Sequence, residues 1–242
     1  MAQNKYDEPE FFANYSQLPR SVHGLDGAAE WPTVQTLLPP MARAHVLDLG
    51  CGFGWFCRWA RTAGAARVHG IDVSQNMLDR AARDTADDAV TYQRADLDEV
   101  LLPSGEYDLV YSSLTLHYLV DVARLFAEVA RTLRPGGSFV ATLEHPIFTA
   151  PSAPGFVQLD GREVWPLDGY SREGSRVTDW LAPGVVKQHR TLTSYLGALR
   201  RAGFTLTDFV EWSPSEDELR EHPDWVTDLD RPMFLMFGAR RQ

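Results

Sequence analysis

The chain has 242 residues, of which 44% are hydrophobic and 11% aromatic. This is enough apolar material for one sizeable core, so we expect a single domain over residues 1–242. A formal charge of −10 opposes binding to a phosphate backbone and argues against a nucleic-acid partner. No apolar run is long enough for a membrane span, no signal pattern opens the chain, and only two cysteines are present, so we expect a cytoplasmic protein without membrane contact.

Residues 1–44 are rich in aromatic side chains that alternate with prolines and polar residues. They include Phe11, Phe12, Tyr15 and Trp31. A free tail would be poorer in apolar residues, so this pattern predicts an N-terminal arm that docks onto the body of the protein.

From residue 45 onward, short apolar stretches alternate with stretches of helical character. Strands are expected at 45–49, 67–71, 90–94, 107–112 and 138–143, and helices at 54–63, 75–83 and 121–133. Pro135-Gly136-Gly137 is expected to end the third helix. This rhythm predicts a doubly wound α/β fold, a parallel sheet with helices on both faces, with its core in residues 45–144.

The first predicted strand runs through Asp48 into a glycine loop, Gly50-Cys51-Gly52-Phe53-Gly54. A strand, a glycine loop and a helix in this order bring backbone close to a ligand. A dinucleotide motif needs a small residue three positions after Gly52, where Trp55 stands, and a phosphate-binding Walker loop would close on Gly-Lys-Ser/Thr. The pattern therefore disfavours a pyrophosphate ligand and leaves a nicotinamide-dependent oxidoreductase as a weaker alternative.

Asp48 followed by three alternating glycines resembles the first motif of class I S-adenosylmethionine (SAM) dependent methyltransferases. Further stretches follow in the order of that family: a strand ending in Asp72, Ala95-Asp96-Leu97 after the strand around Tyr92, and Leu133 to Gly137. The resemblance implies a Rossmann-like sheet of seven strands whose last strand is antiparallel. It also implies SAM as cofactor, S-adenosylhomocysteine (SAH) as product, and no metal.

The resemblance assigns roles to residues. The glycine loop lies against the methionine part of SAM, Asp72 accepts hydrogen bonds from the ribose hydroxyls, Asp96 accepts one from the adenine amine, and Arg20 with Tyr15 holds the carboxylate. The expected cofactor residues are Tyr15, Arg20, Asp48, Gly50, Cys51, Gly52, Gly54, Asp72, Val73, Met77, Ala95, Asp96, Leu97, Ser112, Ser113 and Leu114.

Three residues are candidates for catalysis because they follow the fourth and fifth strands. His117 comes just after strand 107–112, and Glu144 and His145 end the fifth strand. Ligands of open α/β sheets bind at the carboxyl ends of the strands. An ordinary histidine pKa near 6.5 suits proton removal at neutral pH, so we expect His117 or His145 to act as a base, with Glu144 as a helper. A hydrogen-bonded core histidine is the alternative for His117.

Residues 145–190 interrupt the rhythm with many prolines, glycines and scattered aromatics. An unstructured loop of this length would be unusual, so the segment is expected to form a lid or small subdomain with short strands of its own. The expected acceptor-binding residues are His117, Tyr118, His145, Trp165, Tyr170 and Trp180.

Residues 191–242 are expected to complete the sheet with a helix at 193–201 and strands at 204–211 and 232–239. The whole pattern predicts a methyltransferase that acts on an oxygen or nitrogen of a small aromatic or heterocyclic metabolite, as a monomer or homodimer. A protein or RNA acceptor, the nicotinamide-dependent oxidoreductase and a SAM-binding regulator without catalysis are the alternatives.

Overall fold

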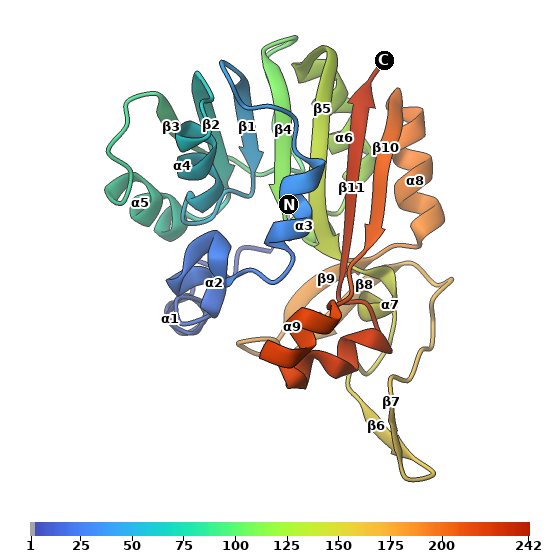
Figure 1. Ribbon diagram of the computed structural model, residues 1–242. Coiled ribbons are helices and arrows are strands. Elements are labelled where there is room, and N and C mark those ends of the chain that lie inside the picture. The colour runs from blue at the N-terminus through green and yellow to red at the C-terminus, as the bar shows by residue number, and fades with distance from the viewer. Residues whose placement is uncertain (1–2) are drawn as a thin grey trace.

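The computed structural model describes residues 3–242 and is built on a seven-stranded sheet in the order β10-β11-β5-β4-β1-β2-β3 (Figure 1). These strands are β1 (His45–Leu49), β2 (Arg67–Asp72), β3 (Val90–Arg94), β4 (Tyr107–Ser113), β5 (Leu133–Glu144), β10 (Phe204–Glu211) and β11 (Phe234–Arg241). The first five pair in parallel. β11 lies antiparallel between β5 and β10, which confirms the predicted seven-stranded fold.

The strands of the sheet centre are apolar because both faces are covered. Val46, Leu47 and Leu49 of β1 have no exposed surface. Such continuous apolar runs are typical of parallel strands with helices on both sides. One face packs on α6 (Val122–Thr132) and α8 (Leu192–Arg201), and the other on α3 (Trp31–Leu37), α4 (Trp55–Thr62) and α5 (Gln75–Arg83). The molecule is therefore doubly wound, as expected.

The Pro-Gly-Gly motif does not end the helix that precedes it. Helix α6 ends at Thr132, and Leu133 already pairs with Tyr107 of β4, so Pro135 to Gly137 lie within β5. Leu133 is fully buried in the core below α6. Burial of this side chain and strand pairing end the helix at Thr132, one residue before the predicted end at 133.

The arm is folded into short helices that the sequence reading did not predict. They are α1 (Pro9–Tyr15), α2 (Pro19–Val22), the 3-10 turn η1 (Gly24–Gly27) and α3. Helices α1, α2 and α3 each have a proline in the first two positions, where its fixed φ and missing N–H do no harm. Phe11 has no exposed surface, and the Asp7 carboxylate accepts hydrogen bonds from the Ser74 hydroxyl and the Asn76 N–H at the start of α5.

The insertion after β5 contains short strands of its own. It comprises α7 (Pro146–Thr149), the hairpin β6 (Val157–Leu159) with β7 (Arg162–Val164), and the hairpin β8 (Gly174–Thr178) with β9 (Val185–His189). Helix α9 (Glu216–Glu221) and turn η3 (Pro223–Leu229) lie near it (Figure 1). Gln3 of the arm exchanges hydrogen bonds with Gly184 and Val186 beside β9, so arm and insertion touch. Within residues 3–242 no helix combines the length and apolar character needed to cross a membrane.

Candidate active site

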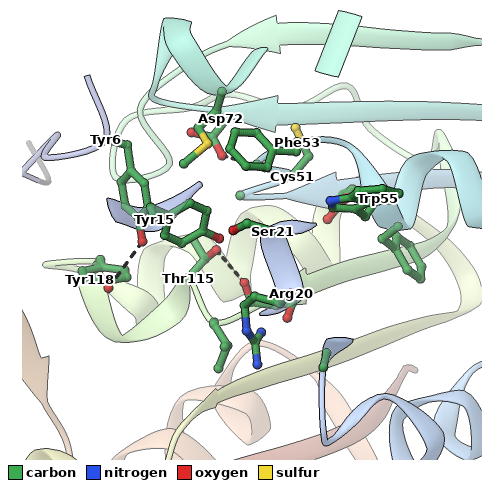
Figure 2. A pocket seen from close by; sticks show the side chains of 18 of the residues that line it. Tyr6, Tyr15, Arg20, Ser21, Cys51, Phe53, Trp55, Asp72, Thr115 and Tyr118 are labelled. Carbon is green, nitrogen blue, oxygen red and sulfur yellow. Dashed lines mark hydrogen bonds between the residues drawn. The ribbon is translucent and has the colours of Figure 1, made fainter. Parts of the chain in front are cut away.

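A cavity of about 420 Å³ opens at the carboxyl ends of β1, β2, β4 and β5. Its size falls within the range of small-molecule sites, roughly 300–1,000 Å³. The arm forms one wall, the glycine loop a second, and the strand ends with Trp180 of the insertion a third. Figure 2 shows Tyr6 and Tyr15 of the arm near Asp72 and Phe53 of the body.

The glycine loop presents bare backbone to the cavity. Gly50, Gly52 and Gly54 have φ of 77°, 51° and 71°, a region that residues with a side chain rarely adopt. A Cβ on Gly52 would meet no atom within 4 Å, so space lies open beside this residue. Gly54 does not line the cavity; a Cβ there would lie 2.2 Å from the Tyr92 hydroxyl. The third glycine therefore serves packing rather than the cavity surface.

Asp72 at the end of β2 fixes this loop. One carboxylate oxygen accepts the Gly52 N–H and the other the Ser74 N–H, both at 2.9 Å. Burial raises the pKa of Asp72, opposed by the hydrogen bonds from Ser74, Gly52 and Val73. A carboxylate has about four acceptor positions, so Asp72 retains capacity for further donors in the cavity.

Asp96 has an unused acceptor in the cavity wall. Its Oδ1 accepts the Asp98 N–H at 2.9 Å, while Oδ2 is buried without a partner among the described residues. A buried acceptor left unpaired is costly, so the site is suited to a ligand that brings a donor. Leu97 also lines the cavity, whereas Ala95 does not; its N–H donates to the Asp72 carbonyl and holds β3 against β2.

Four arm residues, Tyr15, Arg20, Ser21 and Glu30, line the cavity together with Trp55 at the start of α4. The guanidinium of Arg20 donates through Nη2 to both oxygens of buried Glu30 at 3.1 Å, so part of its donor capacity is already used. Trp55 Nε1 and Ser21 Oγ are buried and have no partner among residues 3–242. Neither was predicted as a site residue, although Trp55 already marked the departure from the dinucleotide motif.

Asp48, in β1, also lies in the cavity wall. Its only hydrogen-bond partner among the described residues is the Cys57 thiol, which donates to Oδ2 at 3.3 Å. Burial raises the pKa of Asp48 to about 7, opposed by the bond from Cys57. The carboxyl group is therefore poised to ionise when a cation binds nearby.

His117 lines the cavity, but its geometry does not suit a base. Its Nδ1 accepts the Glu144 backbone N–H at 3.3 Å, so the neutral ring carries its proton on Nε2. Burial lowers the pKa of His117 to about 4, opposed by Glu144, while Lys187 and Arg190 lower it further. The ring is neutral near pH 7, and its one nitrogen lone pair already accepts the Glu144 N–H. This argues against the predicted role of His117 as a proton acceptor and favours a role as hydrogen-bond donor through Nε2.

Glu144 stands beside His117 and has one oxygen to offer. Its Oε1 lies 2.5 Å from Lys187 Nζ and 3.9 Å from His117 Nε2. Oε2 is buried with no partner within the described chain, and Glu144 lines the cavity. Lys187, on β9, is itself almost fully buried. This ion pair could not be predicted, because 43 residues separate its members.

The other predicted residues that line the cavity are Cys51, Val73, Met77, Ser113, Leu114, Tyr118 and Trp180. Leu114 has φ of 50°, and its N–H donates to the Thr142 carbonyl. A leucine in this region is strained, and such strain concentrates at functional sites. Ser112 does not line the cavity, because its hydroxyl points into the sheet and donates to the Leu49 carbonyl.

Three residues predicted to bind the acceptor lie outside the cavity. His145 binds Glu211 through Nε2 at 2.8 Å and caps α7 by accepting the Ile147 N–H. Trp165 donates to the Ile147 carbonyl and stacks on Phe148, which does line the cavity. The Tyr170 hydroxyl accepts the Leu192 N–H. All three support neighbouring structure instead of facing a ligand.

No group of three or more His, Cys, Asp or Glu side chains in residues 3–242 is arranged to hold a metal ion.

Comparison with known proteins identifies the family of proteins that share this fold. A methyltransferase domain model matches residues 47–141. The crystal structure of a SAM-dependent methyltransferase from Mesorhizobium loti is 52% identical, covers 90% of this chain and all of its own, and superposes with a TM-score of 0.87. One from Listeria monocytogenes is 35% identical over 89% of this chain and 99% of its own, with a TM-score of 0.81.

Among curated relatives, the 27-O-demethylrifamycin SV methyltransferase of Amycolatopsis mediterranei is 35% identical over 105 residues. That match spans 42% of this chain and 39% of the relative. It is thus confined to part of each protein.

Proposed function

The chain belongs to the SAM-dependent methyltransferases, and we propose that it transfers the methyl group of SAM to an oxygen or nitrogen atom of a small molecule. The observation that carries the proposal is the single cavity that joins the glycine loop and Asp96 to an aromatic end with His117 and Glu144. Cofactor and acceptor can therefore meet in one cavity.

The residues of the cavity fit SAM. Asp72 has acceptor capacity for the ribose, and the unpaired Oδ2 of Asp96 suits the adenine amine. Trp55 Nε1, with the part of the Arg20 guanidinium that Glu30 leaves, suits the carboxylate. SAM, when bound, supplies a methyl group made electrophilic by its sulfonium. The protein then has to align the acceptor and exclude water, effects that are worth several kcal/mol.

The aromatic end supports a small acceptor. Tyr6, Tyr15 and Phe11 of the arm pack on one another, and Phe11 and Tyr15 pack on Trp180 of the insertion at centroid distances of 5.7 and 6.4 Å. This contact supports a lid role for the insertion. The net charge of −10 disfavours an RNA acceptor. The Amycolatopsis relative is named for a small molecule, which agrees with this class.

Two measurements test the proposal. Calorimetry should show binding of SAM and SAH but not of NAD, and incubation with SAM and a panel of phenols, amines and heterocycles should release SAH, detected by mass spectrometry. Failure to bind SAM would reject the proposal. Tight SAM binding without SAH release from any acceptor would instead support a regulator without catalysis.

A further inference from the structure

We propose that Oε2 of Glu144 binds the methyl acceptor, and that the acceptor is an uncharged aromatic or heteroaromatic molecule that presents an N–H or O–H to this oxygen. The inference rests on the proposed function, because it concerns the acceptor end of the same cavity.

Among the residues that line this end of the cavity, Glu144 has a buried oxygen without a hydrogen-bond partner. Lys187 Nζ holds Oε1 at 2.5 Å and thereby fixes the orientation of the carboxylate, while Oε2 stays buried and unpaired among the described residues. Leaving a buried charged acceptor unsatisfied costs more than leaving a neutral one. A ligand that brings a hydrogen-bond donor would remove this cost.

The charged residues that line the cavity disfavour an anionic acceptor. The acidic residues that line the cavity are Glu30, Asp48, Asp72, Asp96 and Glu144. The basic residue in the lining is Arg20, which pairs with Glu30 within the arm. Lys187 is already paired with Glu144. An anionic group near Oε2 would therefore meet a like charge, and the residues that line the cavity offer no cation without a carboxylate partner.

A cationic acceptor is disfavoured by chemistry. The reacting atom must come close to the positively charged sulfonium of SAM, and a protonated amine has no lone pair to offer. A neutral molecule with a donor at the reacting atom meets both conditions.

The walls at this end suit a flat molecule. The rings of His117 and Tyr118 lie 4.4 Å apart between centroids, and Trp180 and Phe148 also line the cavity. Lys187 Nζ lies 5.1 Å from the Trp180 ring and 5.7 Å from the Phe148 ring, so the buried cation holds both walls as well as Glu144. Aromatic walls with one placed acceptor are typical of sites for planar ligands.

The chemical step balances with Glu144 as proton acceptor. The acceptor oxygen or nitrogen forms a bond to the methyl carbon, the electrons of the carbon–sulfur bond go to sulfur, and the proton released by the acceptor passes to Oε2. Glu144 then returns that proton to water. His117, with Nδ1 held by the Glu144 N–H, positions this pair rather than taking the proton.

The test compares probe pairs that differ in one donor, using protein saturated with SAH. Saturation-transfer NMR titrations would measure 2-naphthol against 2-methoxynaphthalene, benzimidazole against 1-methylbenzimidazole, and 2-naphthoate as the anion. We expect each donor probe to bind at least about fivefold more tightly than its methylated twin, the scale of one hydrogen bond of about 1 kcal/mol. We expect 2-naphthoate to bind most weakly.

Glu144→Gln sharpens the test. Lys187 requires an acceptor, so the glutamine carbonyl should turn to Lys187 and place the amide N–H2 where Oε2 was. The donor probes should then lose their advantage, while SAH affinity stays unchanged. Glu163→Gln is the matched control, because it removes the same charge from an exposed position on β7.

Four outcomes would each overturn the inference. They are equal binding of the donor probes and their methylated twins, tightest binding of 2-naphthoate, no binding of any donor probe, and a wild-type binding pattern in Glu144→Gln. These results leave the proposed function standing, because SAH binding is measured in the same samples. Loss of SAH binding by the wild-type protein would count against the proposed function instead.

Discussion

Replacing Asp72 with alanine tests whether this carboxylate supports the cofactor. The wild-type side chain accepts two backbone N–H groups at 2.9 Å, from Gly52 and Ser74, and we expect it to accept the ribose hydroxyls as well. Truncating a hydrogen bond to a charged group costs about 1.5–3 kcal/mol, which corresponds to roughly a 10- to 150-fold loss of SAH affinity.

The substitution should change the stability of the free protein much less than its affinity for SAH. Burial raises the pKa of Asp72, so the ionised form is less favourable in the folded chain than in the unfolded chain, and the contribution of Asp72 to stability declines as pH rises through the folded-state pKa. The alanine therefore removes a carboxyl group whose ionised form is disfavoured by burial, together with two hydrogen bonds. We expect a net loss of about 1 kcal/mol or less, equivalent to about 2–4 °C in Tm for a chain of this size.

The assay combines calorimetric titration of SAH with a thermal scan of the free protein. Asp88→Ala is the control, because Asp88 is an exposed acid that does not line the cavity and its loss removes the same charge. A folded Asp72→Ala protein with wild-type SAH affinity would refute the reasoning. An affinity loss equal to that of Asp88→Ala would refute it too.

Four further changes test the rest of the site. Asp96→Ala should weaken SAH about 5- to 20-fold, a loss of about 1–1.7 kcal/mol, but should leave binding of the deaminated analogue S-inosylhomocysteine unchanged; equal loss for both ligands would separate Asp96 from the adenine amine. Because the pKa of Asp48 is raised to about 7 and a cationic ligand favours the ionised form, SAM affinity should rise from pH 5.5 to about 7.5 and then level off, whereas Asp48→Asn should show a flat profile in the same calorimetric series. With a pKa of about 4, His117 should contribute no limb to kcat/KM between pH 5.5 and 8, and His117→Asn should retain activity within about tenfold; a loss of about 10²–10⁴-fold with disappearance of an acidic limb would restore the role of a base. Trp55→Phe should weaken SAH about fivefold by removing one N–H, and should not affect decarboxylated SAH; identical effects on both would show that Nε1 does not face the carboxylate.

The sheet and the cofactor loop were predictable because their residues carry local signals. The strand Val46 to Leu49 is apolar throughout, since it is buried on both faces, and the glycines that follow adopt positive φ. Ser74 caps α5 by accepting the Met77 N–H, directly before the predicted start of this helix at residue 75. Each of these features depends on residues close together in the chain.

The acceptor end was less predictable because its properties arise from distant residues. The state of His117 depends on the Glu144 N–H, 27 residues away, and that of Glu144 on Lys187 in the insertion. His145 has the right position at the end of β5, but capping of α7 and Glu211 use both ring nitrogens. Position at a strand end indicated the region correctly and could not tell which side chains face inward.

The helices of the arm were missed because proline reads as a turn signal. Pro9 and Pro19 in fact begin short helices, where the missing N–H costs nothing. The role of Trp55 was missed for a different reason: its indole N–H becomes notable only once the arm has covered it and left it unpaired.

The contacts that hold the arm include those of Asp7 at the start of α5, those of Gln3 with Gly184 and Val186, and that of the Tyr6 hydroxyl, 3.4 Å from the hydroxyl of Tyr118. Since arm residues also line the cavity, we expect some of these contacts to break when SAH leaves. We therefore expect escape of SAH, rather than methyl transfer, to limit steady-state turnover, with a burst of product in the first cycle. Rapid-quench kinetics with a linear first turnover would contradict this order of events.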